Sequence, residues 1–175
     1  MKLLENDRIK LRALEPSDLS ILYKWENDTE QWEVGNALSP YSKYTLNNYI
    51  EESGYDIYQS KQQRLVIEDK ATSQAVGAID MYAFDPHNSH AAIGIIIDPS
   101  AREKKYATEA LELLSSYALG FLHLNQLYAY VPVSNEKSVA LFEKNGFIIT
   151  GKLLQWIHTR NGKEDVYLMQ KLSSY

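Results

Sequence analysis

The sequence predicts an α/β protein of the α+β kind: a mixed, mostly antiparallel sheet with a central strand–loop–helix unit and helices on both faces. Residues 91–97 are apolar and rich in β-branched side chains, and Pro99 follows, as is typical of a strand that ends there. From Ala107 to Phe121 apolar residues recur three or four positions apart, which predicts a helix with one buried face. Strand-like runs joined by short polar turns flank this unit and favour antiparallel pairing.

Size and composition limit the class of protein. The chain has 175 residues, 45% hydrophobic and 23% charged, which suits one globular domain over residues 1–175. It has no cysteine, no apolar stretch of about 20 residues and no apolar signal segment at its start, so we expect a cytoplasmic protein without a membrane partner. The formal net charge of −5 argues against nucleic acid as a partner and suits a cationic small molecule.

The N-terminal third predicts one strand and two short helices. Apolar and basic residues alternate over 8–14, the period of a half-buried strand. Pro16 and the capping side chains beside it predict a helix over residues 19–25. A second short helix is expected near 44–50, and the rest of the acidic, aromatic segment 26–58 is expected to be loop.

A meander and a parallel strand follow. Residues 64–68 and 75–82 predict a hairpin across the polar turn 69–74, and residues 91–97 return as its next strand. After the central helix, residues 127–131 predict a strand parallel to the one before it. Two neighbouring parallel strands that diverge at their carboxyl ends leave a crevice in which ligands bind.

The C-terminal part predicts a capped helix and more strands. Asn135 suits a helix N-cap, and Asn145-Gly146 suits the left-handed stop of that helix. Residues 147–150 and 154–158 are expected as strands, and residues 166–169 pair back across the turn Asn161-Gly162.

Two of these segments resemble the GNAT superfamily of acyl-CoA N-acyltransferases. Residues 102–110, R-E-K-K-Y-A-T-E-A, resemble its pyrophosphate loop, [Q/R]-x-x-G-x-[G/A], with Lys105 at the position of the first glycine. Residues 135–147 resemble its later motif, N-x-x-[SA]-x-x-[LI]-[YF]-x-[KR]-x-G-F. The opening strand and helix are similar to those of the ribosomal-protein and polyamine acetyltransferase branch. The Lys105 side chain could crowd the approach of the backbone to the pyrophosphate, or its ammonium group could attract the pyrophosphate. The sequence leaves both alternatives open.

The resemblance implies that acetyl-CoA (coenzyme A) is the cofactor. Its diphosphate is expected at the start of the central helix, where free N–H groups and the helix dipole favour an anion. Its pantetheine arm is expected to pair with residues 94–97 as an added strand. The expected cofactor-binding residues are Gly94, Ile95, Ile96, Ile97, Arg102, Glu103, Lys104, Lys105, Tyr106, Ala107, Thr108, Asn135, Ser138, Phe142 and Lys144.

The catalytic candidates are fewer. With no cysteine, a thiol-linked acyl-enzyme is excluded, so the acetyl group is expected to pass directly to the acceptor. A backbone N–H at Ile97 is expected to stabilise the oxyanion. Because Phe142 stands where many family members have a tyrosine, the proton donor is Ser138 or a strand tyrosine, Tyr130 or Tyr128. The alternative for Ser138 is a local helix-start hydrogen bond.

The general base and the acceptor site remain open at this stage. The polyamine branch often has a glutamate where this chain has Ala92, which leaves Glu68, Asp80, Tyr82 or a water chain to remove the proton. Aromatic rings and carboxylates can hold an ammonium group. The expected substrate-binding residues are Trp32, Glu33, Asp80 and Tyr82. The competing interpretation is that the tyrosines pack on the sheet and the acids face water.

Three functions are therefore weighed. The first is an N-acetyltransferase acting on a small diamine or polyamine such as spermidine. The second is acetylation of a protein N-terminus of the ribosomal-protein type. The third is a catalytically weak acyl-CoA-binding regulatory module, suggested by Lys105, Phe142 and Ala92. His87 and His90 without a third ligand make a poor metal site, so we expect no metal. By resemblance, the chain is expected to form a homodimer or a larger homo-oligomer.

Overall fold

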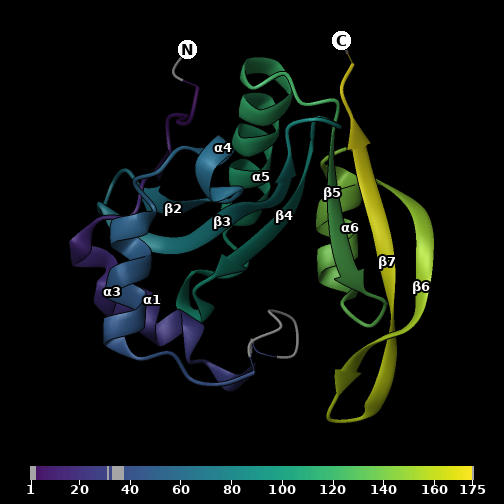
Figure 1. Ribbon diagram of the computed structural model, residues 1–175, viewed down its shortest axis with the longest axis horizontal. Coiled ribbons are helices and arrows are strands. Elements are labelled where there is room, and N and C mark those ends of the chain that lie inside the picture. The colour runs from purple at the N-terminus through teal and green to yellow at the C-terminus, as the bar shows by residue number, and fades with distance from the viewer. Residues whose placement is uncertain (1–2, 31, 33–37, 175) are drawn as a thin grey trace.

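A seven-stranded sheet organises the molecule (Figure 1). The computed structural model describes residues 3–30, 32 and 38–174. The strands are β1 (Ile9–Arg12), β2 (Gln63–Asp69), β3 (Gln74–Asp85), β4 (His90–Ile97), β5 (Gln126–Pro132), β6 (Ile148–Thr159) and β7 (Gly162–Leu172). Their order is β1-β2-β3-β4-β5-β7-β6, and among these strands β4 and β5 pair in parallel while the other neighbours are antiparallel. The mixed, mostly antiparallel sheet predicted from the sequence is confirmed.

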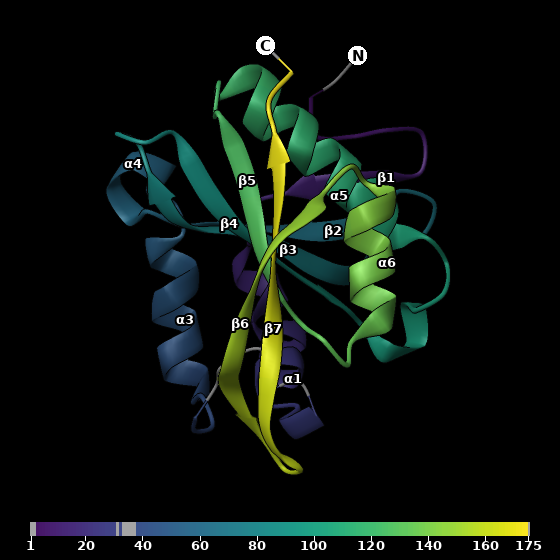
Figure 2. The ribbon, with the colours of Figure 1, turned by 90° about the vertical axis from the view of Figure 1, so that its right-hand side faces the viewer.

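Helices cover both faces of the sheet, as predicted (Figures 1 and 2). Side chains alternate along β2, so Leu65 and Ile67 point to one face and Val66 to the other. Helices α1 (Leu19–Glu26) and α3 (Lys43–Glu52) pack on the Val66 face. Helices α5 (Tyr106–Ser116) and α6 (Glu136–Lys144) pack on the other. The short elements are η1 (Pro16–Asp18), α4 (Ile57–Ser60), η2 (Pro99–Ala101) and η3 (Tyr117–Phe121).

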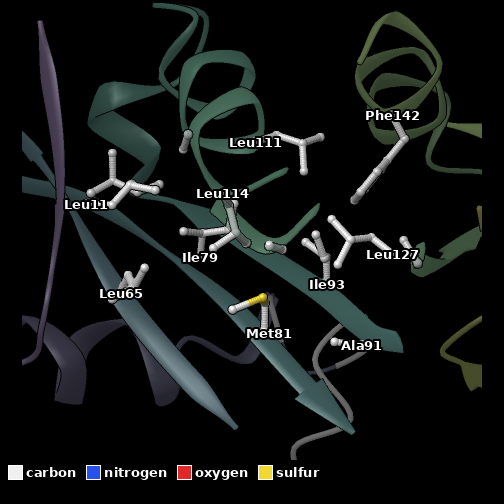
Figure 3. Packing of buried hydrophobic residues seen from close by; sticks show 14 of the residues in the cluster. Leu11, Leu65, Ile79, Met81, Ala91, Ile93, Leu111, Leu114, Leu127 and Phe142 are labelled. Atoms are coloured by element: carbon white, nitrogen blue, oxygen red, sulfur yellow. The ribbon is translucent and has the colours of Figure 1, made fainter. Parts of the chain in front are cut away.

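The larger core lies between the sheet and α5 (Figure 3). Leu111 and Leu114 of α5 are fully buried against Ile79 of β3 and Ile93 of β4. Each buried leucine or isoleucine of this kind contributes about 1.5–3 kcal/mol through the removal of apolar surface from water. This core holds the central β4–α5 unit rigidly in the sheet.

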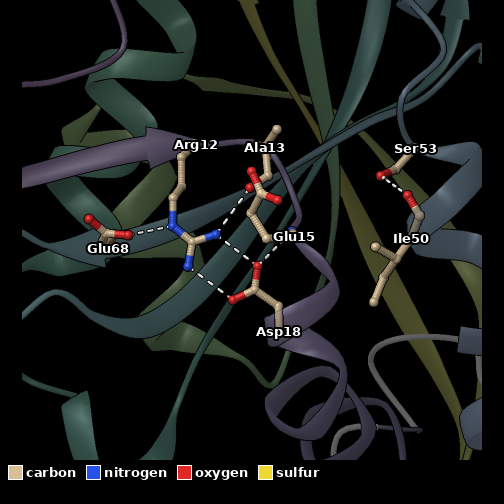
Figure 4. A network of polar contacts seen from close by, with 7 residues as sticks. All are labelled: Arg12, Ala13, Glu15, Asp18, Ile50, Ser53 and Glu68. Carbon is tan, nitrogen blue, oxygen red and sulfur yellow. Dashed lines mark hydrogen bonds and ion pairs between the residues drawn. The ribbon is translucent and has the colours of Figure 1, made fainter. Parts of the chain in front are cut away.

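A partly buried ionic cluster fixes the first strand to the first helix (Figure 4). The Arg12 guanidinium donates to both oxygens of Asp18, at 2.7 and 2.9 Å, and to Glu68 on β2. Burial alone raises the pKa of Asp18, but these hydrogen bonds lower it overall. Glu68 is thereby engaged by Arg12 at the far end of β2.

The structure corrects three details of the sequence prediction. A further helix, α4, begins at the end of segment 26–58, because Asp56 caps it by accepting from the N–H groups of Tyr58 and Gln59. The central helix changes to a π-helical turn at Tyr117–Phe121, and this wider turn leaves Phe121 56% exposed instead of on the buried face. Residues 148–159 form one continuous strand with an irregularity near Gln155, whose φ is 50°, instead of two strands.

Candidate acyl-transfer site

Strands β4 and β5 separate along their length. The paired residues are His90 with Gln126, Ala91 with Leu127 and Ala92 with Tyr128, and the ladder ends there. Beyond that point β4 continues for five residues to Ile97. The crevice expected at the carboxyl ends of two parallel strands is therefore present.

The edge of β4 presents backbone groups to this crevice. On its other edge, Asp98 donates its N–H to the carbonyl oxygen of Val76 at 2.9 Å. Successive N–H groups of a strand point to opposite edges, so the N–H groups of Ile95 and Ile97 point toward β5. Because the β4–β5 ladder has already ended, these two amides are available to an added strand-like ligand.

A cavity of about 420 Å³ opens beside the separated strands. One wall comes from β4 and β5, and another from α6. The end of the cavity formed by α1, β2 and β3 carries all of the charged lining residues that the structure describes: Glu26, Arg64 and Asp80. We call it the acceptor end. The lining residues are Trp25, Glu26, Trp32, Gln62, Arg64, Asp80, Tyr82, Ile93, Gly94, Ile95, Ile96, Tyr130, Val131, Pro132, Asn135, Ser138 and Phe142.

Helix α6 presents one face to the cavity. Asn135 caps the helix by accepting from the Ser138 N–H at 3.1 Å, as the sequence predicts for its N-cap. Asn135, Ser138 and Phe142 are spaced three and four apart, so all three line the cavity from the same side. The Ser138 N–H carries the local bond, and no hydrogen bond of the Ser138 hydroxyl to another described residue is recorded.

The loop before α5 has the backbone that glycine would provide. Lys105 adopts a left-handed conformation, with φ 65° and ψ 7°, and Glu103 has φ 64°. No side chain caps the first turn of α5, so its first N–H groups remain exposed to an anion. Arg8 supports the loop by donating to the Lys104 carbonyl oxygen at 2.6 Å. The Lys105 side chain is exposed and lies at the surface.

Tyr106 contributes backbone only at this position. Its side chain is buried and its hydroxyl donates to Asp69 at 2.5 Å, while the Arg8 guanidinium lies 4.4 Å from the ring centroid. Ala107 and Thr108 follow it in the first turn of α5. The start of α5 is thus anchored in the core while its amides face outward.

The acceptor end of the cavity is an ionic cluster. Arg64 donates from Nε to Asp80 Oδ1 at 2.6 Å and from Nη2 to Asp80 Oδ2 at 2.9 Å, and it also binds Glu26 from Nη1. Burial by itself lowers the pKa of Arg64, but the Asp80 carboxylate raises it overall. Asp80 is therefore occupied by a bidentate ion pair and is poorly placed to act as a general base. Glu68, the other strand carboxylate considered, binds Arg12 and does not line the cavity.

Tyr82 and Tyr130 line the cavity between the acceptor end and β5, whereas Tyr128, the other strand tyrosine predicted as a donor, does not line it. Tyr82 lies opposite Ala92 in the sheet, and Ala92 lies opposite Tyr128. Tyr128 and Tyr130 contact edge to face, with ring centroids 5.6 Å apart. Burial, followed by the neighbouring Tyr128 and Tyr130, raises the pKa of Tyr82 to about 12, so Tyr82 is a neutral phenol at pH 7. Tyr130 is 43% exposed and lines the cavity.

The structure separates some of the predicted residues from the others. Ile97 and Lys144 do not line the cavity: Ile97 lies at the end of β4, and Lys144 is exposed in the last turn of α6. Arg102, Glu103 and Lys104 are exposed on the loop before α5. Glu33 lies outside the described residues. Trp32 does line the cavity, and its indole N–H donates to the Glu26 carbonyl oxygen at 2.9 Å.

Three residues were missed by the sequence analysis. Glu26 and Arg64 complete the acceptor cluster, and Asp98 ties the end of β4 to α1 by accepting from Lys24 at 2.8 Å and Trp25 at 2.9 Å. One signal was available for Arg64: it begins one strand of a predicted hairpin whose other strand carries the opposite charge at Asp80. Nothing in the sequence places Glu26 beside them.

Neither a membrane-spanning helix nor a metal-binding cluster is present among the described residues. None of the helices combines the length and the apolar character needed to cross a bilayer. No group of three or more His, Asp or Glu side chains within this part of the chain is arranged to hold a metal ion.

Comparisons with known proteins agree with this geometry. The family model of an acetyltransferase (GNAT) domain matches residues 8–148. The spermidine N(1)-acetyltransferase of Vibrio cholerae is 28% identical over 172 residues, covering 97% of this chain and 95% of the relative. A crystal structure of the Vibrio cholerae spermidine N-acetyltransferase with CoA and spermine, also 28% identical, superposes with a TM-score of 0.87 over 97% of this chain and 98% of that one. A dodecameric structure of that protein in an intermediate state is 27% identical. It superposes with a TM-score of 0.81 over 97% of this chain and 96% of that one.

Proposed function

Because the chain belongs to the acetyltransferase (GNAT) family, whose model matches residues 8–148, we propose that it transfers an acetyl group from acetyl-CoA directly to an amine, most favourably a small diamine or polyamine such as spermidine. The observation that carries this proposal is the position of one cavity. It joins the separated strands β4 and β5 at one end to a cluster of two carboxylates and two tryptophans at the other.

The donor half of the site fits coenzyme A in two places. The uncapped first turn of α5 offers N–H groups to a diphosphate, with the exposed Arg102, Lys104 and Lys105 adding positive charge nearby. The Ile95 and Ile97 amides offer a strand-like partner to the pantetheine amides. When bound, the thioester supplies the acetyl group, and Asn135, Ser138 and Phe142 line the opposite wall of the cavity.

The residues of the cavity serve the two needs of the transfer. A backbone N–H of β4 that points toward β5 donates to the carbonyl oxygen as negative charge develops on it. The Ile97 N–H, expected from the sequence in this role, lies outside the cavity and serves the pantetheine instead. The C–N bond forms as the C–S bond breaks, and the leaving sulfur takes a proton from the Ser138 hydroxyl, with Tyr130 as the alternative donor. The hydroxyl regains a proton from water in the open cavity. Since Asp80 and Glu68 are held by arginines, the amine proton leaves through water in the open cavity.

The acceptor half fits a cationic substrate. Glu26 and Asp80 carry two negative charges and Arg64 one positive charge, which leaves a net negative acceptor end among its described lining residues. Trp25, Trp32 and Tyr82 surround this end and offer aromatic faces to an alkyl ammonium group. The structurally similar Vibrio cholerae protein is solved with spermine, which supports a polyamine here. A homo-oligomer is proposed on the same ground, since that protein forms a dodecamer.

The test is a turnover assay with product identification. The purified protein is incubated with acetyl-CoA and a panel of diamines, polyamines, monoamines and a peptide with a free N-terminus, while release of free CoA is followed. Mass spectrometry then identifies the acetylated product. We expect amine-dependent CoA release and a singly acetylated diamine or polyamine. Saturable binding of acetyl-CoA without turnover on any amine would instead identify a CoA-binding module, and acetylated peptide alone would identify a protein N-acetyltransferase.

A further inference from the structure

Resting on the proposed function, we propose that Arg64 is a specificity-determining residue that limits the acceptor site to one ammonium group, bound at Glu26. The guanidinium occupies the place of a second substrate cation. It does so by taking both oxygens of Asp80 and one oxygen of Glu26.

The contacts of Arg64 show how the two carboxylates differ. Both Asp80 oxygens accept from Arg64, at 2.6 and 2.9 Å. Glu26 uses Oε1 for Arg64, and no partner for Glu26 Oε2 is recorded among the described residues. The arginine side chain is 17% exposed, that of Asp80 14% and that of Glu26 25%. The oxygen that remains available to a ligand therefore belongs to the more exposed carboxylate, Glu26, and not to Asp80.

The aromatic surroundings keep this arrangement in place. The Arg64 guanidinium lies 5.4 Å from the centroid of the Tyr49 ring, and the Tyr49 hydroxyl accepts from Gln62 at 3.3 Å. A planar guanidinium held by a bidentate carboxylate and an aromatic face is strongly restrained. A substrate ammonium cannot displace it without breaking two charge-assisted hydrogen bonds to Asp80.

The net charge of the acceptor end then determines the preferred acceptor. Glu26, Arg64 and Asp80 are the only charged residues in the described lining, and their charges sum to −1. The attacking nitrogen must be unprotonated, so the remaining negative charge is available to one neighbouring ammonium group of the acceptor. A diamine places one ammonium group at Glu26 while its other nitrogen attacks. A third amino group finds no free carboxylate here and therefore does not increase the affinity.

The experiment compares a diamine with a triamine, 1,4-diaminobutane and spermidine, in wild type, Arg64→Gln and Arg64→Lys. The ratio of kcat/KM for the triamine over the diamine is measured at fixed ionic strength and pH 8. Arg64→Gln frees a second carboxylate, so we expect this ratio to rise at least fivefold over wild type. Arg64→Lys keeps the positive charge, so we expect the ratio to stay within twofold. An unchanged ratio in Arg64→Gln overturns the proposal.

A second variant covers the case in which Arg64→Gln does not fold. Glu26→Gln removes the available carboxylate and is expected to raise the KM for the diamine at least tenfold while the KM for acetyl-CoA stays within twofold. The matched control is Glu52→Gln, at an exposed position on α3. We expect it to leave the KM for the diamine and the KM for acetyl-CoA unchanged. A diamine KM within twofold of wild type in Glu26→Gln overturns the proposal.

Direct binding separates failure of this inference from failure of the proposed function. Calorimetric titration of each amine into the CoA-saturated protein gives the triamine-to-diamine affinity ratio for the same variants. If wild type shows no turnover, the acetyltransferase proposal fails, and these binding ratios still decide the role of Arg64. Equal ratios in wild type and Arg64→Gln would then overturn it.

Discussion

Phe142 lines the site without an ionisable group. It is 4% exposed and contacts Phe147 edge to face, with ring centroids 5.0 Å apart. A hydroxyl for the leaving thiolate must therefore come from elsewhere on the cavity wall, and Ser138 lies one helical turn earlier on the same face of α6. Tyr130 is the other hydroxyl proposed as donor.

Replacing Ser138 by Ala tests this assignment. A thiolate is a good leaving group, because a thiol has a pKa of about 8.5, so the acid contributes less than the usual general acid. We expect kcat to fall about tenfold and the KM for acetyl-CoA to change less than about threefold. Ser134→Ala, at an exposed serine before the helix, is the matched control. Full activity in Ser138→Ala together with a loss in Tyr130→Phe would move the role to the tyrosine.

At the residue scale, the sequence predicted correctly the positions of those residues that lie within a single motif. Asn135, Ser138 and Phe142 could be placed together because helical spacing brings them to one face. Asp80 could be placed in the site, and Arg64 on the partner strand of the predicted hairpin was a signal for their ion pair, but Glu26 binds Arg64 from α1 and could not be predicted beside them. Pairwise contacts between distant segments depend on packing that one sequence does not reveal.

At the scale of elements, the loop before α5 shows why one departure from the family pattern is tolerated. Lys105 keeps the left-handed backbone that favours glycine, with φ 65°. For an L-residue that conformation costs about 1–2 kcal/mol, which the anchoring of Tyr106 and the Arg8 bond to the loop oppose. Local sequence predicted the strand–loop–helix unit but not this strain.

Glycine substitutions at two adjacent lysines test the strain. Both Lys105→Gly and Lys104→Gly remove one positive charge and add similar freedom to the unfolded chain. Lys105 has positive φ, whereas Lys104 is not among the residues with positive φ. Lys105→Gly should therefore be the more stable variant by about 1–2 kcal/mol in urea unfolding. Equal free energies of unfolding would contradict a strained loop.

The same scale explains the errors in the element prediction. Helix α4 depends on a single capping carboxylate, Asp56, in a segment with no clear apolar period. The π-helical turn at Tyr117–Phe121 changes the periodicity within one apolar run. The sequence predicted two strands over 147–150 and 154–158, but Gly151, Lys152 and Leu153, which lie between them, pair with β7 as well, and pairing resumes at Ile157.

At the scale of the whole molecule, Asp98 connects the first helix to the end of β4. Its side chain accepts from Lys24, Trp25 and Ser100. Burial alone raises the pKa of Asp98, but the hydrogen bond from Lys24, followed by those from Trp25 and Ser100, lowers it well below its usual range. Trp25 also lines the cavity, so the Asp98 carboxylate fixes the position of the acceptor end relative to β4, where coenzyme A is expected.

Asp98→Asn tests this connection through its pH dependence. A carboxyl whose pKa is lower in the folded state stabilises the protein above its unfolded pKa of about 3.9, and that stability is lost as the pH falls further. At pH 7 we expect Asp98→Asn to lower the free energy of unfolding by about 2 kcal/mol. The difference from wild type should shrink below about pH 4. Asp7→Asn, at an exposed carboxylate, is the control, and a difference that does not vary with pH would contradict the account.

The crystal structure of this protein with coenzyme A tests the central claim most directly. The account predicts that the pantetheine amides pair with Ile95 and Ile97 and that the diphosphate rests on the first N–H groups of α5. It further predicts that the thiol points into the cavity between Ser138 and Tyr130. Coenzyme A bound at another surface, or β4 and β5 paired along their whole length in the complex, would contradict it.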